Sequence, residues 1–305
     1  MPCKRIPQVP KRGAGDLSNT DRRMSGDAVV TPLETMIAVL HQKIPITEVG
    51  GFVSKLRRLS GNLDSCFSDV ELGTACSGSD IIIHVLTELF TFYKHTYGIT
   101  LNLRPRFACE LDPEKRAFLQ AQFDQDTIYE NVTELGKQVL PNMVTGRPCH
   151  VPATFMFCAG FSCKTRSKLN KHSSAMRNCI QYGAGEAETT QTWIGVQQYL
   201  TEKQPRLVLL ENVKELTEAK DGISDADHII KTLQGLGYVA TYKVFDSGDY
   251  GSIQRRLRLY FFAWFHGGTD ISRAERTLWA RIADHSVSGQ FDSPCLGARG
   301  VPRFR

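Results

Sequence analysis

Two cysteines lie five positions apart in the segment FMFCAGFSCKTRS, where an apolar run gives way to a turn of small residues and then to positive charge. Cys158 belongs to the apolar run, which assigns it to the core. Cys163 follows the turn, directly before Lys164 and close to Arg166 and Lys168. Positive neighbours lower the pKa of a thiol and raise its thiolate fraction. The segment therefore favours Cys163 as a nucleophile; the alternative is an inert cysteine in a loop.

A second chemical group follows the apolar run LVLL, which leads into Glu211 and Asn212. A carboxylate at the end of a buried strand is partly desolvated, and desolvation raises its pKa. A raised pKa suits Glu211 to hold or donate a proton near neutral pH. The alternative interpretation is that the two residues cap the next helix.

Basic residues occupy the segment YGSIQRRLRLYFFAW, where a loop leads into an apolar strand. Side chains alternate along a strand, so Arg256 and Arg258 are expected on one face. Two guanidinium groups on one face suit the binding of a phosphate or of the edge of a base. The alternative is a solvated, basic start of a strand.

Small residues follow the first expected strand, Ala75-Cys76-Ser77-Gly78, and a long apolar helix begins shortly after them. Such a turn lets a ligand approach the backbone at a helix N-terminus. Glu110 follows the second expected strand, where doubly wound folds keep an acid that binds ribose hydroxyl groups. Taken singly, these features also fit a helix-capping turn and a solvated carboxylate.

The elements that must position these groups alternate between strand and helix from residue 69 onward. Apolar runs typical of strands occupy residues 70–76, 106–111, 153–158, 206–213, 239–245 and 257–265. Segments with helical patterns occupy residues 81–98, 113–123, 189–203 and 225–237. This alternation predicts an α/β fold with a doubly wound, mostly parallel sheet and helices on both faces. Ligands bind such sheets at the carboxyl ends of the strands.

The 305 residues fit one main domain with attachments. Residues 1–31 are polar and rich in Pro and Gly, and are expected to be a disordered basic arm. Residues 32–68 contain short amphipathic helical patterns. We expect the sheet domain to occupy residues 69–265 and to be followed by a helix and a tail over residues 266–305.

Charge and cysteine content narrow the functional classes. A net charge of +5 permits a polyanionic partner without requiring one. Nine cysteines are spread too thinly for a disulfide framework, and no apolar run is long enough to cross a bilayer. The polar, basic N-terminus does not resemble a secretory signal. These features predict a reducing, soluble compartment, and no metal site is expected.

The order of the chemical groups resembles the catalytic domain of the cytosine carbon-5 methyltransferases, over about residues 69–265. AGFSCKTRS is similar to the family's G-G-P-P-C-Q-x-F-S and matches it at Gly160, Cys163 and Ser167. LLENV is similar to the family's glutamate motif and matches it at Glu211 and Asn212.

Further likenesses extend the resemblance along the chain. QRRLR matches the family's Q-x-R-x-R at Gln254, Arg256 and Arg258. Weaker likenesses are LGTACSGSD to the first cofactor motif and ACELDP to the ribose-binding acid. IYENVTEL resembles the third motif, although Asn131 replaces the aspartate that reads the adenine.

The resemblance implies a class I S-adenosylmethionine-dependent methyltransferase with a Rossmann-like fold. It implies that the thiolate of Cys163 adds to carbon 6 of a cytosine in DNA while Glu211 engages ring nitrogen 3, after which carbon 5 takes the methyl group. The target base must leave the helical stack. The implied residues are Cys163, Glu211, Arg256 and Arg258 for catalysis, Ala75, Cys76, Ser77, Gly78, Glu110, Asn131 and Gly160 for the cofactor, and Ser167, Asn212 and Gln254 for the substrate.

This sequence also departs from the family. Ser162, Lys164 and Arg166 stand where the family has proline, glutamine and phenylalanine, so the rigid turn that aims the thiol is altered. About 40 residues follow the sheet domain, too few for the family's target-recognition domain and closing motifs, which fits a fragment, a divergent minimal enzyme or a protein that has lost the reaction. Three functions stay open: a DNA methyltransferase acting in the nucleus, a non-catalytic nucleic-acid binder, and a methyltransferase of transfer RNA.

Overall fold

The computed structural model describes residues 69–97, 100–164, 179–182, 188–219, 222–250 and 252–266. All of them lie in one compact unit, residues 47–305. The expected arm, the expected helical appendage, residues 267–305 of the expected helix and tail, and Ser167 lie outside the described residues.

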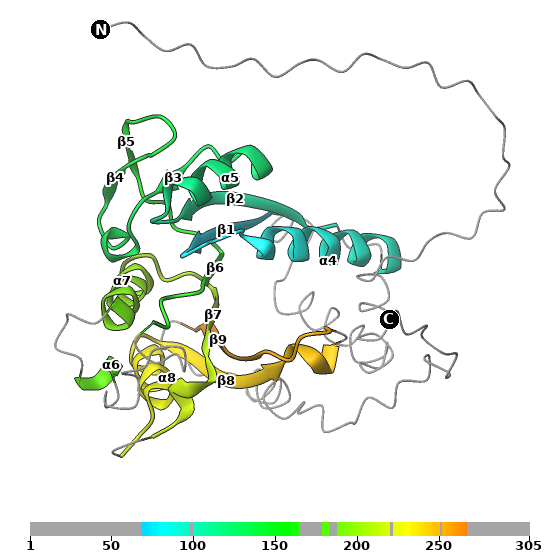
Figure 1. The fold of residues 1–305 in the computed structure, drawn as a ribbon. Helices are drawn as coiled ribbons and strands as arrows, with labels where there is room; N and C mark the ends of the chain where they lie inside the picture. Colours follow the sequence, from blue (N-terminus) through cyan, green and yellow to red (C-terminus); the bar gives the residue numbers. More distant parts are fainter. Residues whose placement is uncertain are drawn as a thin grey trace, which may run out of the picture. The chain divides into compact units, whose positions relative to one another are not determined.

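Within the described residues, seven strands form one sheet in the order β3-β2-β1-β6-β7-β9-β8 (Figure 1). Neighbours from β3 to β7 pair in parallel, whereas β9 is antiparallel to both β7 and β8. The strands are β1 (Asp69–Ala75), β2 (Asn102–Cys109), β3 (Ile128–Tyr129), β6 (Met156–Ala159), β7 (Leu207–Val213), β8 (Tyr238–Asp246) and β9 (Leu257–Phe265). The predicted doubly wound, mostly parallel α/β sheet is confirmed.

The reversed direction of β9 follows from its short connection to β8. β8 ends at Asp246, β9 begins at Leu257, and the turn η3 (Ser247–Tyr250) lies between them. A parallel partner needs a crossover of about a dozen residues or more, whereas antiparallel neighbours can be joined directly. The start of β9 therefore lies at the edge where the parallel strands end, which brings Arg256 and Arg258 to that edge.

Helices cover both faces of the sheet. α4 (Ile81–Tyr97) and α5 (Pro113–Phe123) pack on one face, whereas α7 (Glu188–Lys203) and α8 (Asp225–Gly235) pack on the other (Figure 1). The smaller elements are α6 (Cys179–Tyr182), η1 (Val132–Glu134), η2 (Lys214–Thr217) and a hairpin of β4 (Val139–Pro141) and β5 (Pro148–His150). Among the described residues, no helix has the length and apolar character needed to span a membrane.

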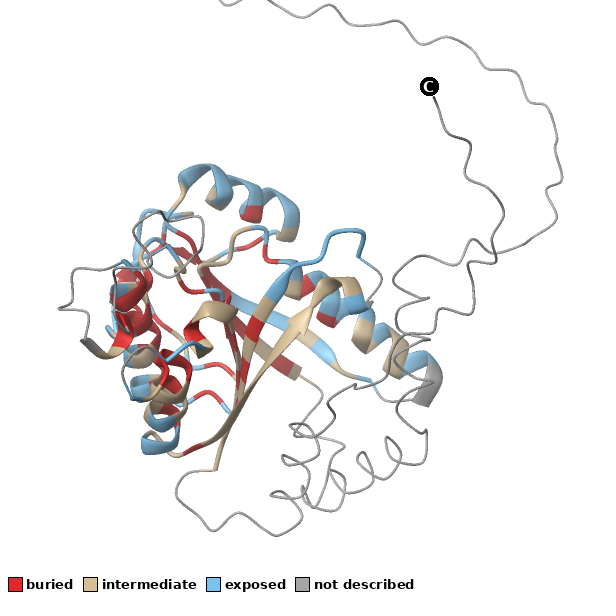
Figure 2. Ribbon diagram, turned by 60° about the horizontal axis from the view of Figure 1, so that its bottom comes forward, coloured by how far each residue is buried: buried red, intermediate tan, exposed pale blue. Residues whose placement is uncertain are grey.

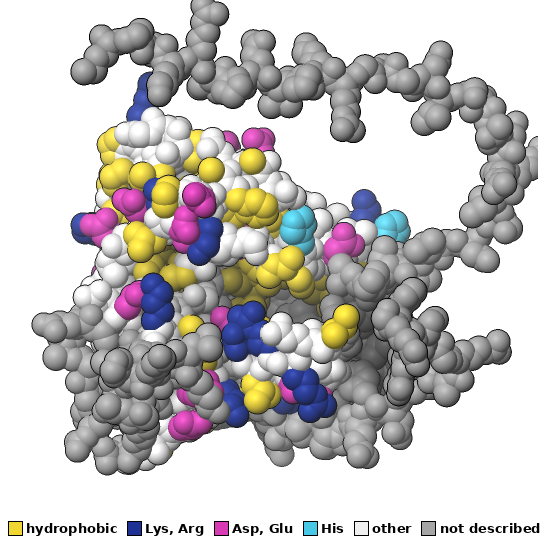
Figure 3. All heavy atoms as spheres, in the orientation of Figure 1, with side chains coloured by type: hydrophobic (Ala, Val, Ile, Leu, Met, Phe, Trp, Pro, Cys, Tyr) yellow, Lys and Arg dark blue, Asp and Glu magenta, His cyan; other side chains and the backbone are white. Residues whose placement is uncertain are grey.

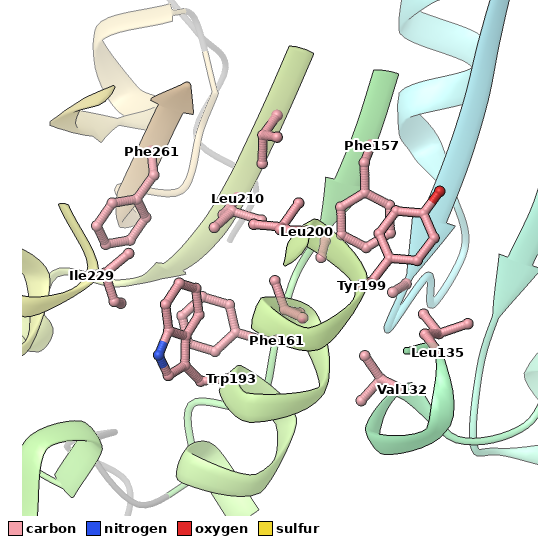
Figure 4. Packing of buried hydrophobic residues seen from close by; sticks show 14 of the residues in the cluster. Val132, Leu135, Phe157, Phe161, Trp193, Tyr199, Leu200, Leu210, Ile229 and Phe261 are labelled. Atoms are coloured by element: carbon pink, nitrogen blue, oxygen red, sulfur yellow. The ribbon is translucent and has the colours of Figure 1, made fainter. Parts of the chain in front are cut away.

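Alternation along the central strands sends successive side chains to opposite helix layers. Cys158 of β6 packs with Leu72 and Leu86 in the layer that contains α4. Phe157 points to the other layer, where its ring stacks on Tyr199 of α7 with 4.4 Å between centroids (Figure 4). Figure 2 shows the buried residues along the sheet and in the helices beside it. The prediction that Cys158 belongs to the core is confirmed.

α7 approaches the η1 turn closely at Gly195. A Cβ placed on Gly195 would lie 2.4 Å from the carbonyl oxygen of Val132 and 2.7 Å from Cα of Thr133. These are backbone atoms, which cannot move aside as a flexible side chain would. The glycine therefore allows α7 to seat its buried side chains, Trp193 and Tyr199, against the sheet.

The variant Gly195→Ala is expected to lower the free energy of unfolding by about 1–3 kcal/mol, the usual cost of overpacking a core. Gly235→Ala is the matched control, because a Cβ at this last residue of α8 would meet no atom within 4 Å. The control should be neutral or stabilising by up to about 1 kcal/mol. Urea unfolding compares the two variants, and equal stabilities would contradict this packing.

Candidate active site

The loop of residues 160–164 follows β6 at the carboxyl edge of the sheet. The amide of Gly160 donates to the carbonyl of Ala75 at 3.3 Å. Phe161 is buried, its ring packs against α7 (Figure 4), and its carbonyl accepts a hydrogen bond from Asn212 Nδ2 at 2.9 Å. The residues that precede the thiol are therefore held by β1, α7 and β7.

A charged pair joins β7 to β9 beside this loop. Arg258 Nε lies 2.8 Å from Glu211 Oε1. Arg258 is opposite Val213 in the antiparallel register, so the pair is a diagonal contact on one face of the sheet. The side chains of Glu211 and Arg258 keep 34% and 25% of their surface exposed, which leaves the pair accessible to a ligand.

The thiol of Cys163 is half-buried and lies within the electrostatic field of this pair. Burial raises the pKa of the Cys163 thiol and Glu211 raises it further, whereas Arg258 and Arg256 lower it. The structure therefore brings together one thiol, one carboxyl group and two guanidinium groups that are far apart in the sequence.

The prediction of a lowered pKa for the Cys163 thiol is wrong, because the pKa is raised. Desolvation is the largest influence on this pKa and outweighs the arginines. The ammonium group of Lys164 lies 3.0 Å from Glu188 Oε2, where it neutralises a charge on α7. Arg166 and Lys168 lie outside the described residues.

The carboxyl group of Glu211 has the predicted electrostatic character. Burial raises its pKa, and Arg258 and Arg256 offset part of the rise. A Cβ placed on Gly160 would lie 3.4 Å from Glu211 Oε2 and 3.9 Å from the carbonyl oxygen of Cys76. Gly160 therefore stands between the carboxyl group and the loop that follows β1.

The loop after β1 turns through left-handed backbone, with φ of 52° at Cys76, 57° at Gly78 and 50° at Asp80. Such angles are rare outside glycine and occur where surrounding contacts hold the chain. One such contact is the amide of Ser77, which donates to the carbonyl of Cys109 at the end of β2 at 3.3 Å.

Glu110 connects this loop to the end of β2. Its Oε2 accepts from the amide of Gly78 at 2.8 Å, and its Oε1 accepts from the amide of Asp112 at 3.1 Å. Glu110 is buried, whereas the next residue, Leu111, exposes 64% of its surface. The small-residue turn and the strand-end acid, two separate features of the sequence, are therefore hydrogen-bonded to each other.

Asn131 follows β3 along the same edge. The amide of Glu110 donates to the carbonyl of Tyr129 at 3.0 Å, which places the end of β3 beside the acid. Asn131 Oδ1 accepts from the amide of Thr133 at 3.0 Å and caps η1. The side chain therefore shapes the third loop of this edge and stays partly exposed.

The loop between β8 and β9 is fastened by its own side chains. Asp246 Oδ1 accepts from the amides of Gly248 at 3.0 Å and Arg256 at 3.2 Å. Ser247 Oγ donates to the carbonyl of Gln254 at 2.6 Å. These contacts fix the backbone at Arg256, while the side chains of Gln254 and Arg256 remain exposed.

A hollow of about 500 Å³ lies next to the charged pair. Its lining residues are Lys214, Glu215, Gln254, Arg255, Arg256, Leu257 and Arg258. Four of these seven side chains are cationic and one is anionic, so the hollow favours an anion. Figure 3 shows Lys and Arg side chains near the centre of the face that carries β7 to β9.

The predicted site residues divide into three groups. Cys163, Glu211, Arg256 and Arg258 come together, and Gln254 lines the adjoining hollow. Asn212 is 1% exposed and donates to the loop backbone, so it does not face the hollow. The residues predicted for the cofactor, apart from Gly160 itself, lie at the ends of β1, β2 and β3. Gly160 separates the loop after β1 from the Glu211 carboxyl group.

Sequence reasoning missed several contributors to this edge. Asp246 could have been found from the sequence, because it is the polar residue that ends the apolar strand β8. Lys214 and Thr192 carry no local signal, because their importance depends on contacts across the fold. Among the described residues, no three His, Cys, Asp or Glu side chains are grouped in the manner of a metal site.

Comparison of the sequence with known proteins identifies the family to which the chain belongs. The family model for C-5 cytosine-specific DNA methylases matches residues 97–280. DNA (cytosine-5-)-methyltransferase DMT5 of Cryptococcus neoformans var. grubii is 28% identical over 250 residues, which are 81% of this chain and 9% of that protein. DMT5 of Verticillium dahliae is 25% identical over 260 residues, which are 70% of this chain and 11% of that protein.

The matched parts are small portions of those relatives, since the chain spans about a tenth of the length of the two DMT5 proteins. Among solved structures, the S. pombe Dnmt2 methyltransferase aligns with a TM-score of 0.43 and 13% identity, over 71% of this chain and 56% of that one. The segment matched by the family model covers more than half of the chain and includes Cys163, Glu211 and Arg258, so the chain belongs to the C-5 cytosine-specific DNA methylase family.

Proposed function

We propose that this chain transfers a methyl group from S-adenosylmethionine to carbon 5 of cytosine in DNA, through a covalent adduct with Cys163. The observation that carries the proposal is the meeting of the Cys163 thiol, the Glu211 carboxyl group and the Arg258 guanidinium at one edge of the sheet. A thiol next to a carboxyl group of raised pKa supplies both a nucleophile and a proton-holding group.

The first step requires the thiolate of Cys163. Its sulfur forms a bond to carbon 6 of the cytosine, and the electron pair of the 5,6 double bond moves onto the ring. Because burial raises the pKa of the thiol, the thiol is protonated near neutral pH, and its proton passes to a water molecule before the sulfur attacks. Arg256 and Arg258 favour the thiolate, since both lower that pKa.

Glu211 handles the charge that the first step creates. Its raised pKa lets the carboxyl group retain a proton closer to neutral pH and share it with ring nitrogen 3 of the cytosine. Arg258 keeps the group in place through the ion pair. After methyl transfer, a water molecule takes the proton from carbon 5. The electron pair of that carbon–hydrogen bond forms the 5,6 double bond again, and the carbon–sulfur bond breaks with its electron pair on sulfur, which restores the thiolate and the aromatic ring.

The loops at the ends of β1 and β2 suit an adenosyl group. A Cβ on Gly78 would meet nothing within 4 Å, so this part of the loop faces open space. The fixed carboxylate of Glu110 can accept further hydrogen bonds from ribose hydroxyl groups, and the exposed side chain of Leu111 offers an apolar surface for a ring. When bound there, S-adenosylmethionine supplies a methyl group on a sulfonium centre that a carbon nucleophile can attack.

The basic hollow suits the phosphate backbone of the nucleic acid. Lys214 and Arg255 line it beside the catalytic arginines. Extrusion of the target base costs on the order of a few kcal/mol, and phosphate contacts at this position help to offset that cost. We expect Gln254, and Ser167 outside the described residues, to contact the substrate strand. A DNA substrate favours action in the nucleus.

Covalent trapping tests the central claim. With S-adenosylmethionine and a duplex containing 5-fluorocytosine, the protein should form an adduct that survives denaturing electrophoresis. Cys163→Ser should abolish the adduct, and Glu211→Gln should slow its formation by about 100-fold or more, because it removes the proton donor. Cys158→Ala, on the core face of β6, is the control and should still form it. Adduct formation by Cys163→Ser would disprove the mechanism.

The pH dependence of thiol alkylation tests the electrostatics without any substrate. At the alkaline pH where the thiol titrates, Glu211 is ionised, so Arg258→Ala removes a lowering influence and leaves the raising influence of Glu211. The midpoint for alkylation of Cys163 by iodoacetamide should therefore move to higher pH. Arg255→Ala is the matched control, because Arg255 is not among the groups that shift this pKa. Identical midpoints for the three proteins would rule out the described proximity.

Salt dependence tests the role of the basic hollow. Replacing Lys214 or Arg255 by alanine should each reduce the slope of log affinity for duplex DNA against log salt by about 1, as expected for one lost phosphate contact. Arg104→Ala is the control, since Arg104 of β2 pairs with Asp69 of β1, and β6 and β7 separate these strands from β9. Fluorescence anisotropy measures the slopes. Unchanged slopes, or tighter binding of transfer RNA than of DNA, would count against the proposal.

A further inference from the structure

Ser162 stands where the family motif has proline, and its backbone amide makes a bond that proline cannot make. The amide nitrogen of Ser162 donates to Thr192 Oγ1 at 3.1 Å. Proline has no amide hydrogen. The residue directly before the thiol is therefore tied to α7 by a contact that depends on the departure from the motif.

Thr192 is arranged to accept this bond. Its hydroxyl group lies 2.9 Å from the carbonyl oxygen of Glu188 and 3.1 Å from that of Thr189, to which it donates within its own helix. With the hydrogen directed into the helix, a lone pair of the oxygen faces the amide of Ser162. The next residue of α7, Trp193, is buried against Phe161 with 5.7 Å between ring centroids (Figure 4), so the acceptor sits on a fixed helix.

The contacts around Ser162 form a continuous series. Gly160 is bonded to β1, Phe161 to Asn212 of β7, and Ser162 to Thr192 of α7. The Lys164–Glu188 ion pair is a second contact between the loop and α7. Both side chains are exposed, so this pair contributes little to the stability of the loop. The buried side of the loop ends in the Ser162–Thr192 bond, directly before Cys163.

We infer that Thr192 is a positioning residue for the Cys163 thiol, and that the Ser162–Thr192 hydrogen bond does in this chain what a proline ring does in the family motif. The inference rests on the proposed function for its catalytic consequence. Its structural content, a thiol held half-buried by α7, stands independently of the reaction.

The inference makes the two positions interdependent. A proline at position 162 would place its ring carbon about 1.5 Å from the nitrogen, in the direction of the lost hydrogen. That carbon would overlap the Thr192 hydroxyl, which lies 3.1 Å from the same nitrogen. Alanine at position 192 removes both the acceptor and the obstacle. Each single change is therefore harmful, whereas the double change restores a rigid turn.

The experiment compares Thr192→Ala, Thr192→Ser, Ser162→Pro and the double variant Ser162→Pro/Thr192→Ala. Thr201→Ala is the matched control, because Thr201 also lies on α7 and its hydroxyl also bonds to the carbonyl four residues earlier, at 2.9 Å, on the exposed side of the helix. Two quantities are measured: the single-turnover rate of adduct formation with 5-fluorocytosine DNA, and the rate of Cys163 alkylation by iodoacetamide in the free protein.

Thr192→Ala and Ser162→Pro should each slow adduct formation at saturating DNA by about 10-fold, as expected for one lost hydrogen bond that aims a reacting atom. Thr192→Ser, Thr201→Ala and the double variant should stay within about 2-fold of the unaltered protein. Alkylation of Cys163 should be faster in the two impaired variants, since release of the loop relieves the burial that raises the thiol pKa.

The outcomes separate this inference from the proposed function. If Thr192→Ala matches Thr201→Ala in both measurements, or if the double variant is no better than Ser162→Pro, the positioning role is wrong. If the unaltered protein forms no adduct, the proposed function fails, and the alkylation rates alone decide whether Thr192 holds the thiol loop.

Discussion

The ion pair between Glu211 and Arg258 is the interaction on which the candidate site depends. It requires a strand that starts, and not one that ends, beside the carboxyl end of β7, and the antiparallel β9 provides that start. The arginine compensates the charge of a partly buried carboxyl group and at the same time acts on the neighbouring thiol. A carboxyl group left in this position without its partner would carry an uncompensated charge, so the pair links the stability of the edge to its chemistry.

Gly160 separates two functional regions that lie on adjacent strands. On one side lies the loop after β1, which Glu110 fastens to β2; on the other lies the carboxyl group of Glu211. Parallel strands end at a common edge, so residues more than a hundred positions apart are neighbours there. A side chain at this position would contact both the Glu211 carboxyl group and the carbonyl of Cys76, so the glycine keeps the space between the two regions free.

The sequence was sufficient to predict the sheet, the helix layers, the core position of Cys158 and the raised pKa of Glu211, because these depend on local periodicity and on burial at strand ends. It was misleading for the Cys163 thiol, where neighbours along the chain suggested a lowered pKa and desolvation in the fold produces the reverse. The bonds from Gly78 to Glu110 and from Ser162 to Thr192 join residues about 30 positions apart, and no local pattern specifies such pairs.

The raised pKa of the Cys163 thiol also affects the rate at which oxidants react with it. Peroxides attack the thiolate, and a thiol that stays protonated near neutral pH is oxidised slowly. The other thiol of the same segment, Cys158, is sealed on the opposite side of the sheet, where it is no partner for a disulfide with Cys163. The burial that raises the pKa of the Cys163 thiol therefore also favours its reduced state.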